Sequence, residues 1–167
     1  LAFMAYCLCG DTSRQIFKMN IGYSAGNGKS TEFKIHHGVF PCYSQKLPKN
    51  VFDENNPKRH KSMVSVLTNP IRFLYVEELS TKKMDADYIK DLVDGANLDC
   101  EVMYGTKITH AVQAKLLTCS NKDFKTDVDE GITRRGIVQY YESMFRGLDE
   151  EDEEWFGEDK HQYLKDR

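Results

Sequence analysis

An α/β fold with a central parallel sheet is predicted by three features of this 167-residue sequence. The run 73–76 is apolar at every position, as in a strand that is buried on both faces of a parallel sheet. The segment 85–93 has the apolar spacing of a helix. Further upstream, a glycine-rich loop at 21–31 joins an apolar run to another helical segment. Strands and helices that follow one another in this way predict one α/β domain.

The composition is that of a globular domain, with 40% hydrophobic and 29% charged residues. A formal net charge of −3 argues against nonspecific nucleic-acid binding by the whole surface, while a local basic patch is still compatible with it. The five cysteines are odd in number and include no Cys-x-x-Cys pair, which argues against a zinc site or a disulfide framework. We therefore expect reduced thiols and a reducing intracellular compartment, cytoplasmic or nuclear.

The apolar run 1–9 is far shorter than the ~20 residues that span a bilayer, and it lacks a basic segment before it. We expect a buried helix that Gly10 ends, and no membrane association. Because the chain begins with Leu1 and not with methionine, we interpret it as a fragment of a longer protein.

The loop at 21–31 has the features of a phosphate-binding loop, and the apolar run 16–21 before it predicts a strand. Its glycines allow successive N–H groups to point at an anion. Lys29 supplies a cation for the β- and γ-phosphates, Ser30 or Thr31 supplies a hydroxyl for Mg²⁺, and the following helix adds its positive dipole end. The residues predicted to bind the nucleotide are Gly22, Ser24, Ala25, Gly26, Asn27, Gly28, Lys29, Ser30 and Thr31.

The loop departs from the usual G-x-x-x-x-G-K-[ST] spacing at one position. The residue five before Gly28 is Tyr23, and Gly22 lies one position further back. The alternative interpretation is a glycine turn with a solvated lysine.

The next segment predicts a short helix over 31–37 that Gly38 ends. A strand over 39–43 would lie at the sheet edge, because its proline cannot donate to a neighbouring strand. A polar loop follows, and the basic run 58–61 begins a helix that Asn69-Pro70 ends. This basic run is either a solvated face or a contact with nucleic acid or another subunit.

Two carboxylates, Glu77 and Glu78, follow the apolar strand at 73–76. A strand that delivers acids at its carboxyl end beside a phosphate loop is the Walker B arrangement. Glu77 would help to hold Mg²⁺, and Glu78 would polarise the attacking water. The alternative is the exposed start of a helix.

The helix at 85–93 is capped by Asp85 or Asp87 and closed by Gly95. Alternating segments at 100–104 and 108–112 then flank Gly105-Thr106-Lys107, which predicts a hairpin with a basic tip. In this hairpin Lys107 and His110 are candidates for contact with a phosphate backbone. The alternative is a surface hairpin without a ligand.

Another apolar strand, at 115–120, ends at Asn121, whose amide would orient the water or sense the γ-phosphate. After an acidic loop at 127–131, Arg134 and Arg135 approach a strand at 137–141. Paired arginines there suit a charge clamp on the nucleotide of a neighbouring subunit, with a structural salt bridge as the alternative.

The acidic run 149–154 should be solvated. We therefore divide the chain into an ATPase core at 1–146 and an acidic tail, or the start of a following segment, at 147–167.

Together these motifs resemble the helicase domain of superfamily 3, within the AAA+ class of P-loop ATPases. The resemblance is strongest to the poxvirus-type primase–helicases of large DNA viruses and to related phage and plasmid primase–helicases, and it covers roughly 1–146. The segments that carry it are 26–30, 73–78, 90–95 with the hairpin that follows, 116–121 and 129–135.

The resemblance implies an AAA+-like central parallel sheet flanked by helices, with a β-hairpin inserted after Walker B. It also implies a hexameric ring that hydrolyses ATP between subunits, with Arg134 or Arg135 as the arginine finger. Single-stranded DNA would bind in the central channel through the hairpin around Lys107. A primase-like portion would precede this domain in the full protein, which would act where a viral or mobile-element genome is replicated.

The resulting hypothesis is an ATP-driven DNA helicase motor. Lys29, Ser30 and Glu77 would hold Mg·ATP, and Glu78 and Asn121 would position water. One alternative is a P-loop kinase for small molecules, although no acceptor motif is evident. Another is a nonenzymatic assembly module that binds nucleotide, against which the two adjacent carboxylates argue.

Overall fold

The computed structural model describes residues 2–23, 26–101, 105–122, 130–143 and 145, except for the side chains of His60 and Glu101. Predictions about Ser24 and Ala25, about 127–129 and about the tail at 147–167 lie outside the described residues. In the part of the chain that is described, no helix is both long and apolar enough to cross a membrane.

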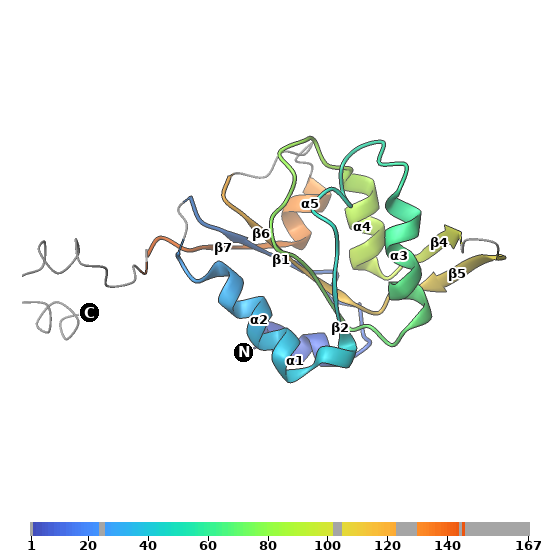
Figure 1. Ribbon diagram of the computed structural model, residues 1–167, viewed down its shortest axis with the longest axis horizontal. Coiled ribbons are helices and arrows are strands. Elements are labelled where there is room, and N and C mark those ends of the chain that lie inside the picture. Colours follow the sequence, from blue (N-terminus) through green and yellow to red (C-terminus); the bar gives the residue numbers. More distant parts are fainter. Residues whose placement is uncertain (1, 24–25, 102–104, 123–129, 144, 146–167) are drawn as a thin grey trace, which may run out of the picture.

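The core is a five-stranded sheet in the order β2-β3-β6-β1-β7, in which every neighbouring pair is parallel (Figure 1). The α/β fold with a parallel sheet is therefore confirmed. The strands are β1 (Phe17–Ile21), β2 (Ser44–Lys46), β3 (Phe73–Val76), β6 (Lys115–Ser120) and β7 (Gly136–Tyr140).

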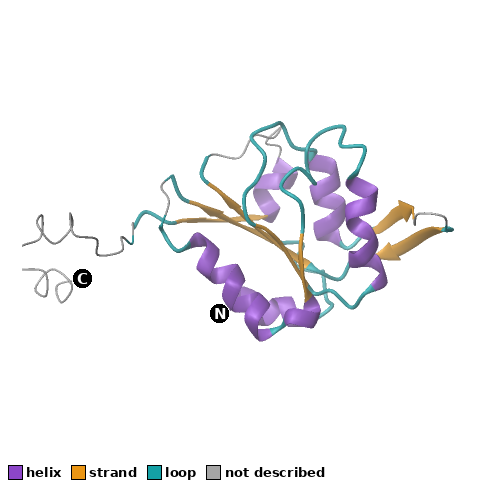
Figure 2. Cartoon of the chain, in the orientation of Figure 1, coloured by secondary structure: helices purple, strands orange, loops and turns teal. Residues whose placement is uncertain are grey.

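Helices cover both faces of this sheet (Figure 2). One face carries α1 (Ala2–Leu8) and α2 (Lys29–Val39), and the other carries α3 (Arg59–Thr68), α4 (Ala86–Asp94) and α5 (Glu130–Arg135).

Alternation along the strands divides the core into two layers. In β3, Phe73 and Tyr75 join a cluster with Phe33 of α2, while Leu74 and Val76 face the larger cluster under α3 and α4. This is the period-2 pattern of a strand that is buried on both faces.

The strands β4 (Asn97–Glu101) and β5 (Lys107–Ala111) form a separate antiparallel hairpin, which packs against α3. This confirms the predicted hairpin after the acid-bearing strand. The helix before it is also confirmed: Asp85 is its N-cap, accepting from the Tyr88 N–H at 3.0 Å, and Gly95 closes it with φ 73°.

Several predicted boundaries were wrong. The first helix lies where expected, but Cys7 is its only buried residue among 2–8. Helix α2 continues through Gly38, because the cost of a helical glycine, about 1 kcal/mol, is small beside tertiary packing.

The predicted edge strand at 39–43 is instead the end of α2 and a 3₁₀ turn, η1 (Pro41–Tyr43). The edge strand is the polar segment Ser44–Lys46, which is held by pairing with β3. Arg134 and Arg135 lie in helix α5, and not in an extended approach to a strand.

Candidate functional site

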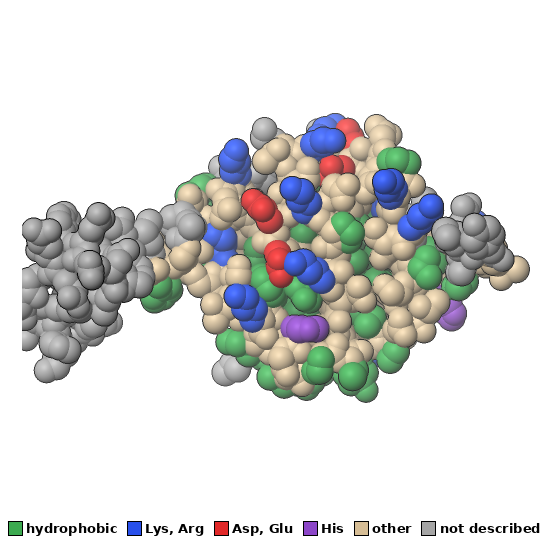
Figure 3. Space-filling model, viewed as in Figure 1, with side chains coloured by type: hydrophobic (Ala, Val, Ile, Leu, Met, Phe, Trp, Pro, Cys, Tyr) green, Lys and Arg blue, Asp and Glu red, His purple; other side chains and the backbone are tan. Residues whose placement is uncertain are grey.

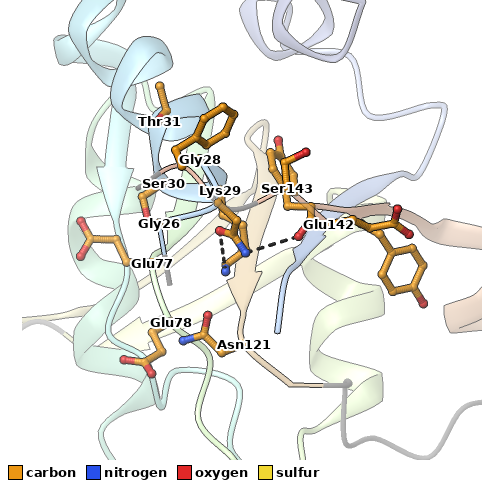
Figure 4. A pocket seen from close by; sticks show the side chains of 14 residues that line it. Gly26, Gly28, Lys29, Ser30, Thr31, Glu77, Glu78, Asn121, Glu142 and Ser143 are labelled. Atoms are coloured by element: carbon orange, nitrogen blue, oxygen red, sulfur yellow. Dashed lines mark hydrogen bonds between the residues drawn. The ribbon is translucent and has the colours of Figure 1, made fainter. Parts of the chain in front are cut away.

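A pocket opens where the strands β1, β3, β6 and β7 end, which is the usual place for a ligand in a parallel sheet (Figure 4). Its lining comprises residues 26–31, Glu77 and Glu78, Asn121, 140–143 and Phe145. The fold thus brings the described part of the phosphate loop, both acids and the asparagine together. This is possible because β6 lies between β1 and β3, so Asn121 sits between the loop and the acids.

Backbone conformation and close packing explain the glycines of the loop. Gly26 and Gly28 have φ of 69° and 84°, in the left-handed region that favours glycine. A Cβ on Gly22 would lie 2.0 Å from Nδ2 of Asn27, so the asparagine side chain fills the space that a larger residue would need. Tyr23 has no positive φ and is 65% exposed, which explains how the loop accommodates it at this position.

Lys29 is 7% exposed and folds back over its own loop. Its Nζ donates to the Gly22 carbonyl at 2.8 Å and to Oδ1 of Asn27 at 2.9 Å. Asn27 in turn donates to the Tyr141 carbonyl at 3.4 Å (Figure 4). Burial lowers the pKa of Lys29 from its usual value. A bound phosphate would offer this buried ammonium stronger, charged acceptors than the neutral oxygens of Gly22 and Asn27.

Glu77 and Glu78 are both exposed at the carboxyl end of β3. Glu77 forms an ion pair with Lys46 at the end of β2, so this position already accommodates a cation. Figure 4 shows the side chain of Asn121 directed toward Glu78, and Ser30 on the same side of the loop as Glu77.

The donor set suits Mg²⁺ bound together with a nucleotide. Ser30 and Glu77 offer one hydroxyl and one carboxylate, and Mg²⁺ commonly takes few protein ligands while it keeps phosphate oxygens and waters. Among the described residues no group of three or more His, Cys, Asp or Glu could hold a metal by itself.

A buried polar cluster behind the loop was missed in the sequence. The Glu32 carboxylate accepts from Lys18 Nζ at 2.6 and 2.7 Å, from Asn20 Nδ2 at 2.7 Å and from the Tyr141 hydroxyl at 2.9 Å. Burial raises the pKa of Glu32, but these hydrogen bonds and the Lys18 charge outweigh burial, and the pKa falls below its usual value of 4.5. The sequence contains a pattern that could have indicated this cluster, because the polar residues Lys18 and Asn20 alternate with apolar residues in β1.

The segment after β7, residues 141–143 and 145, lies against the loop and was also missed. Its Tyr141 N–H donates to the Ile21 carbonyl at 2.7 Å, and its Phe145 N–H donates to the Gly26 carbonyl at 2.7 Å. We call this the post-β7 segment. It forms the side of the pocket opposite to the acids (Figure 4).

The two arginines do not line this pocket. Arg135 is 9% exposed and makes a bidentate pair with Asp94 at 2.7 and 2.6 Å, which matches the structural salt bridge considered for this pair. Arg134 is exposed and donates to Oε1 of Gln15 at 2.8 Å. Of the two, Arg134 is therefore the one whose guanidinium is accessible to another subunit.

The two predicted DNA contacts lie on the hairpin, at the opposite end of the fold from the start of α2 and the end of β7 (Figure 1). Lys107 is exposed and pairs with Asp99 at 2.6 Å, and His110 is exposed on the same strand. Basic side chains of the described residues are spread over the face in Figure 3, with acidic side chains between them. This face therefore shows no extended basic patch among the residues described.

No protein-family model and no curated protein matches the sequence. Among solved structures, two apo structures of the NrS-1 C-terminal region match 92% of this chain, at 13% identity with a TM-score of 0.58 and at 14% identity with 0.56. The match covers 34% of each of those chains, so this chain spans about a third of their length.

A structure of JCV helicase with a bound thiazolopyridine compound matches 78% of this chain and 37% of its own at 11% identity. Its TM-score of 0.49 is too low to add to the comparison. The NrS-1 likeness shows the fold: this chain has the α/β architecture of the NrS-1 C-terminal region, in agreement with the parallel sheet predicted from its sequence.

Proposed function

We propose that this chain is the ATPase motor of a DNA helicase of the superfamily 3 type. The observation that carries the proposal is one pocket in which the loop with Lys29, the acid pair and Asn121 meet at the carboxyl ends of parallel strands. A passive nucleotide site does not need two acids and an amide beside the phosphates, whereas hydrolysis does.

The roles of the residues follow from their positions. The loop amides and Lys29 bind the phosphates, and Ser30 and Glu77 would hold Mg²⁺, which neutralises developing negative charge when it is bound. The Glu78 carboxylate accepts a hydrogen bond from the attacking water, and the Asn121 amide holds that water in line. Movement of Lys29 from the Gly22 carbonyl onto the phosphates accompanies binding.

The remaining part of the active site would come from a neighbouring subunit of a hexameric ring. Arg134 supplies the finger, because Arg135 is engaged by Asp94. Lys107 and His110 on the hairpin contact single-stranded DNA in the channel. A primase-like domain would precede this motor in the full protein, as part of viral or mobile-element replication.

The test is ATP hydrolysis at high protein concentration, with and without single-stranded DNA. We expect hydrolysis that DNA stimulates, and its loss in Lys29→Ala. The matched control is Lys34→Ala, which removes an exposed lysine from the same helix and should leave the rate unchanged.

Other results would redirect the proposal. Hydrolysis without any response to DNA would leave an ATPase but remove the helicase function. Phosphate transfer to a nucleoside would indicate a kinase. Tight nucleotide retention without hydrolysis, in an assembled ring, would indicate an assembly module.

A further inference from the structure

The pocket has two chemically different sides, separated by the phosphate loop. Glu77, Glu78 and Asn121 lie on one side, and the post-β7 segment lies on the other (Figure 4). If the phosphates of a nucleotide meet Lys29 and a metal at Glu77, its base must extend away from the acids. The base therefore reaches the side that the post-β7 segment forms.

Two aromatic residues of this segment, Tyr141 and Phe145, contact the phosphate loop, and Phe145 is the more exposed of them. Its backbone N–H donates to the Gly26 carbonyl at 2.7 Å. Its ring atom Cε2 lies 3.4 Å from the position that a Cβ on Gly28 would take. The Phe145 carbonyl oxygen lies 2.8 Å from the Cβ position of Gly26, so only a glycine there permits this approach.

Although its backbone N–H is hydrogen-bonded to the loop, the residue is 70% exposed, the largest fraction among the large hydrophobic residues that are exposed in the described chain. An exposed aromatic ring on the lining of a ligand pocket provides a surface for stacking. The ring carries no hydrogen-bonding group, so the contact adds affinity without reading the edge of a base.

We propose that Phe145 stacks on the base of the nucleotide and supplies the base-binding surface of this site. The inference rests on the proposed function, because it needs a nucleotide whose phosphates bind the loop. It names the ligand more closely: a nucleoside triphosphate whose base is held by its flat face. The Phe145 contact serves adenine and guanine alike.

The experiment compares binding of Mg·ATP, Mg·GTP and Mg·tripolyphosphate by calorimetry. Tripolyphosphate has the phosphates but no base. Phe145→Ala and Phe145→Leu should weaken the binding of ATP and of GTP by a similar factor, about tenfold. This factor lies within the usual range for base–aromatic stacking. Tripolyphosphate binding should not change. Phe145→Trp should retain ATP affinity because it restores a ring.

Tyr43→Ala is the matched control, since it removes an aromatic residue that is 46% exposed and lies outside the pocket. Unchanged ATP affinity in Phe145→Leu would overturn the inference and leave the proposed function intact. Equal weakening of ATP binding and tripolyphosphate binding would also overturn the inference, because Phe145 would then act through the conformation of the loop. If the wild-type chain bound neither ligand, the proposed function and this inference would both fail.

Discussion

At the residue scale, the Glu32 carboxylate connects the strand before the phosphate loop, the helix after it and the post-β7 segment. Lys18 and Asn20 donate from β1, and Tyr141 donates from beyond β7. The side chains of Lys18 and Glu32 are only 11% and 21% exposed, so breaking this ion pair leaves a poorly solvated ammonium. Such a loss usually costs several kcal/mol, unlike the loss of a surface pair.

We predict that Glu32→Gln lowers the free energy of unfolding by about 2–4 kcal/mol at pH 7. The folded-state pKa of Glu32 is lowered, so its contribution is fully present above the usual value of 4.5 and is lost as pH falls through the lowered pKa. The difference between the two proteins should therefore shrink below about pH 4.5. Urea unfolding of both proteins at several pH values measures this difference in the free energy of unfolding.

The control for this prediction is Glu54→Gln, which breaks an exposed pair with Lys83 at 3.1 Å. It should cost less than about 1 kcal/mol. Parallel stability curves for the wild type and Glu32→Gln across the acidic range would contradict the role assigned to the Glu32 charge.

At the element scale, the sequence predicted the buried strands and the capped helix α4 well. Continuous apolar runs and a local cap are properties of neighbouring residues, and a sequence displays them directly. The edge strand Ser44–Lys46 has no such pattern, because its extended state comes from pairing with β3. The end of α2 was misplaced for the related reason that packing outweighs the local preference of Gly38.

In the candidate site, too, some parts could be predicted from local sequence and others could not. The loop, the acids and Asn121 belong to short motifs, and the parallel topology brings them together. The Glu32 cluster and the post-β7 segment depend on contacts between distant parts of the chain, such as Asn27 with the Tyr141 carbonyl. Nothing local in the sequence indicated that contact. The pairing of Arg135 with Asp94 is likewise a product of how α5 packs near α4.

The β4–β5 hairpin permits a prediction about nucleic acid. If Lys107 contacts a phosphate, Lys107→Ala should make the slope of log affinity for single-stranded DNA against log salt shallower by about 0.7. ATP affinity should not change, because the hairpin lies away from the pocket. Asp99→Asn, which weakens the ion pair now holding Lys107, should strengthen DNA binding.

The matched control is Lys83→Ala, another exposed lysine in an ion pair with an acid. It should leave the salt slope unaltered. A slope that stays the same in Lys107→Ala would reassign Lys107 to the solvated surface.

At the scale of the whole molecule, the pocket combines the parts that bind a nucleotide with an acid pair but contains no arginine among its described lining residues. An arginine finger is typically worth about 10³–10⁵ in rate. If a neighbour supplies it, hydrolysis per molecule should fall steeply when the protein is diluted through the range in which subunits dissociate. A constant rate per molecule on dilution would contradict a shared site.

Mixing two inactive variants tests which arginine crosses the interface. Arg134→Ala should lose hydrolysis with little change in stability, because Arg134 is exposed and its partner, Gln15, is only partly buried. Arg135→Ala should mainly destabilise the fold, by about 2–3 kcal/mol, because Asp94, whose side chain is 29% exposed, loses its charged hydrogen-bond partner. In an equal mixture of Arg134→Ala and Lys29→Ala, some interfaces join an intact loop from one subunit to an intact Arg134 from the other. Those interfaces should recover part of the activity that each variant lacks alone. Activity can recover only if Lys29 and Arg134 act at one site from different subunits. If the mixture is as inactive as each variant alone, Arg134 either takes no part in the reaction or acts at the site of its own subunit.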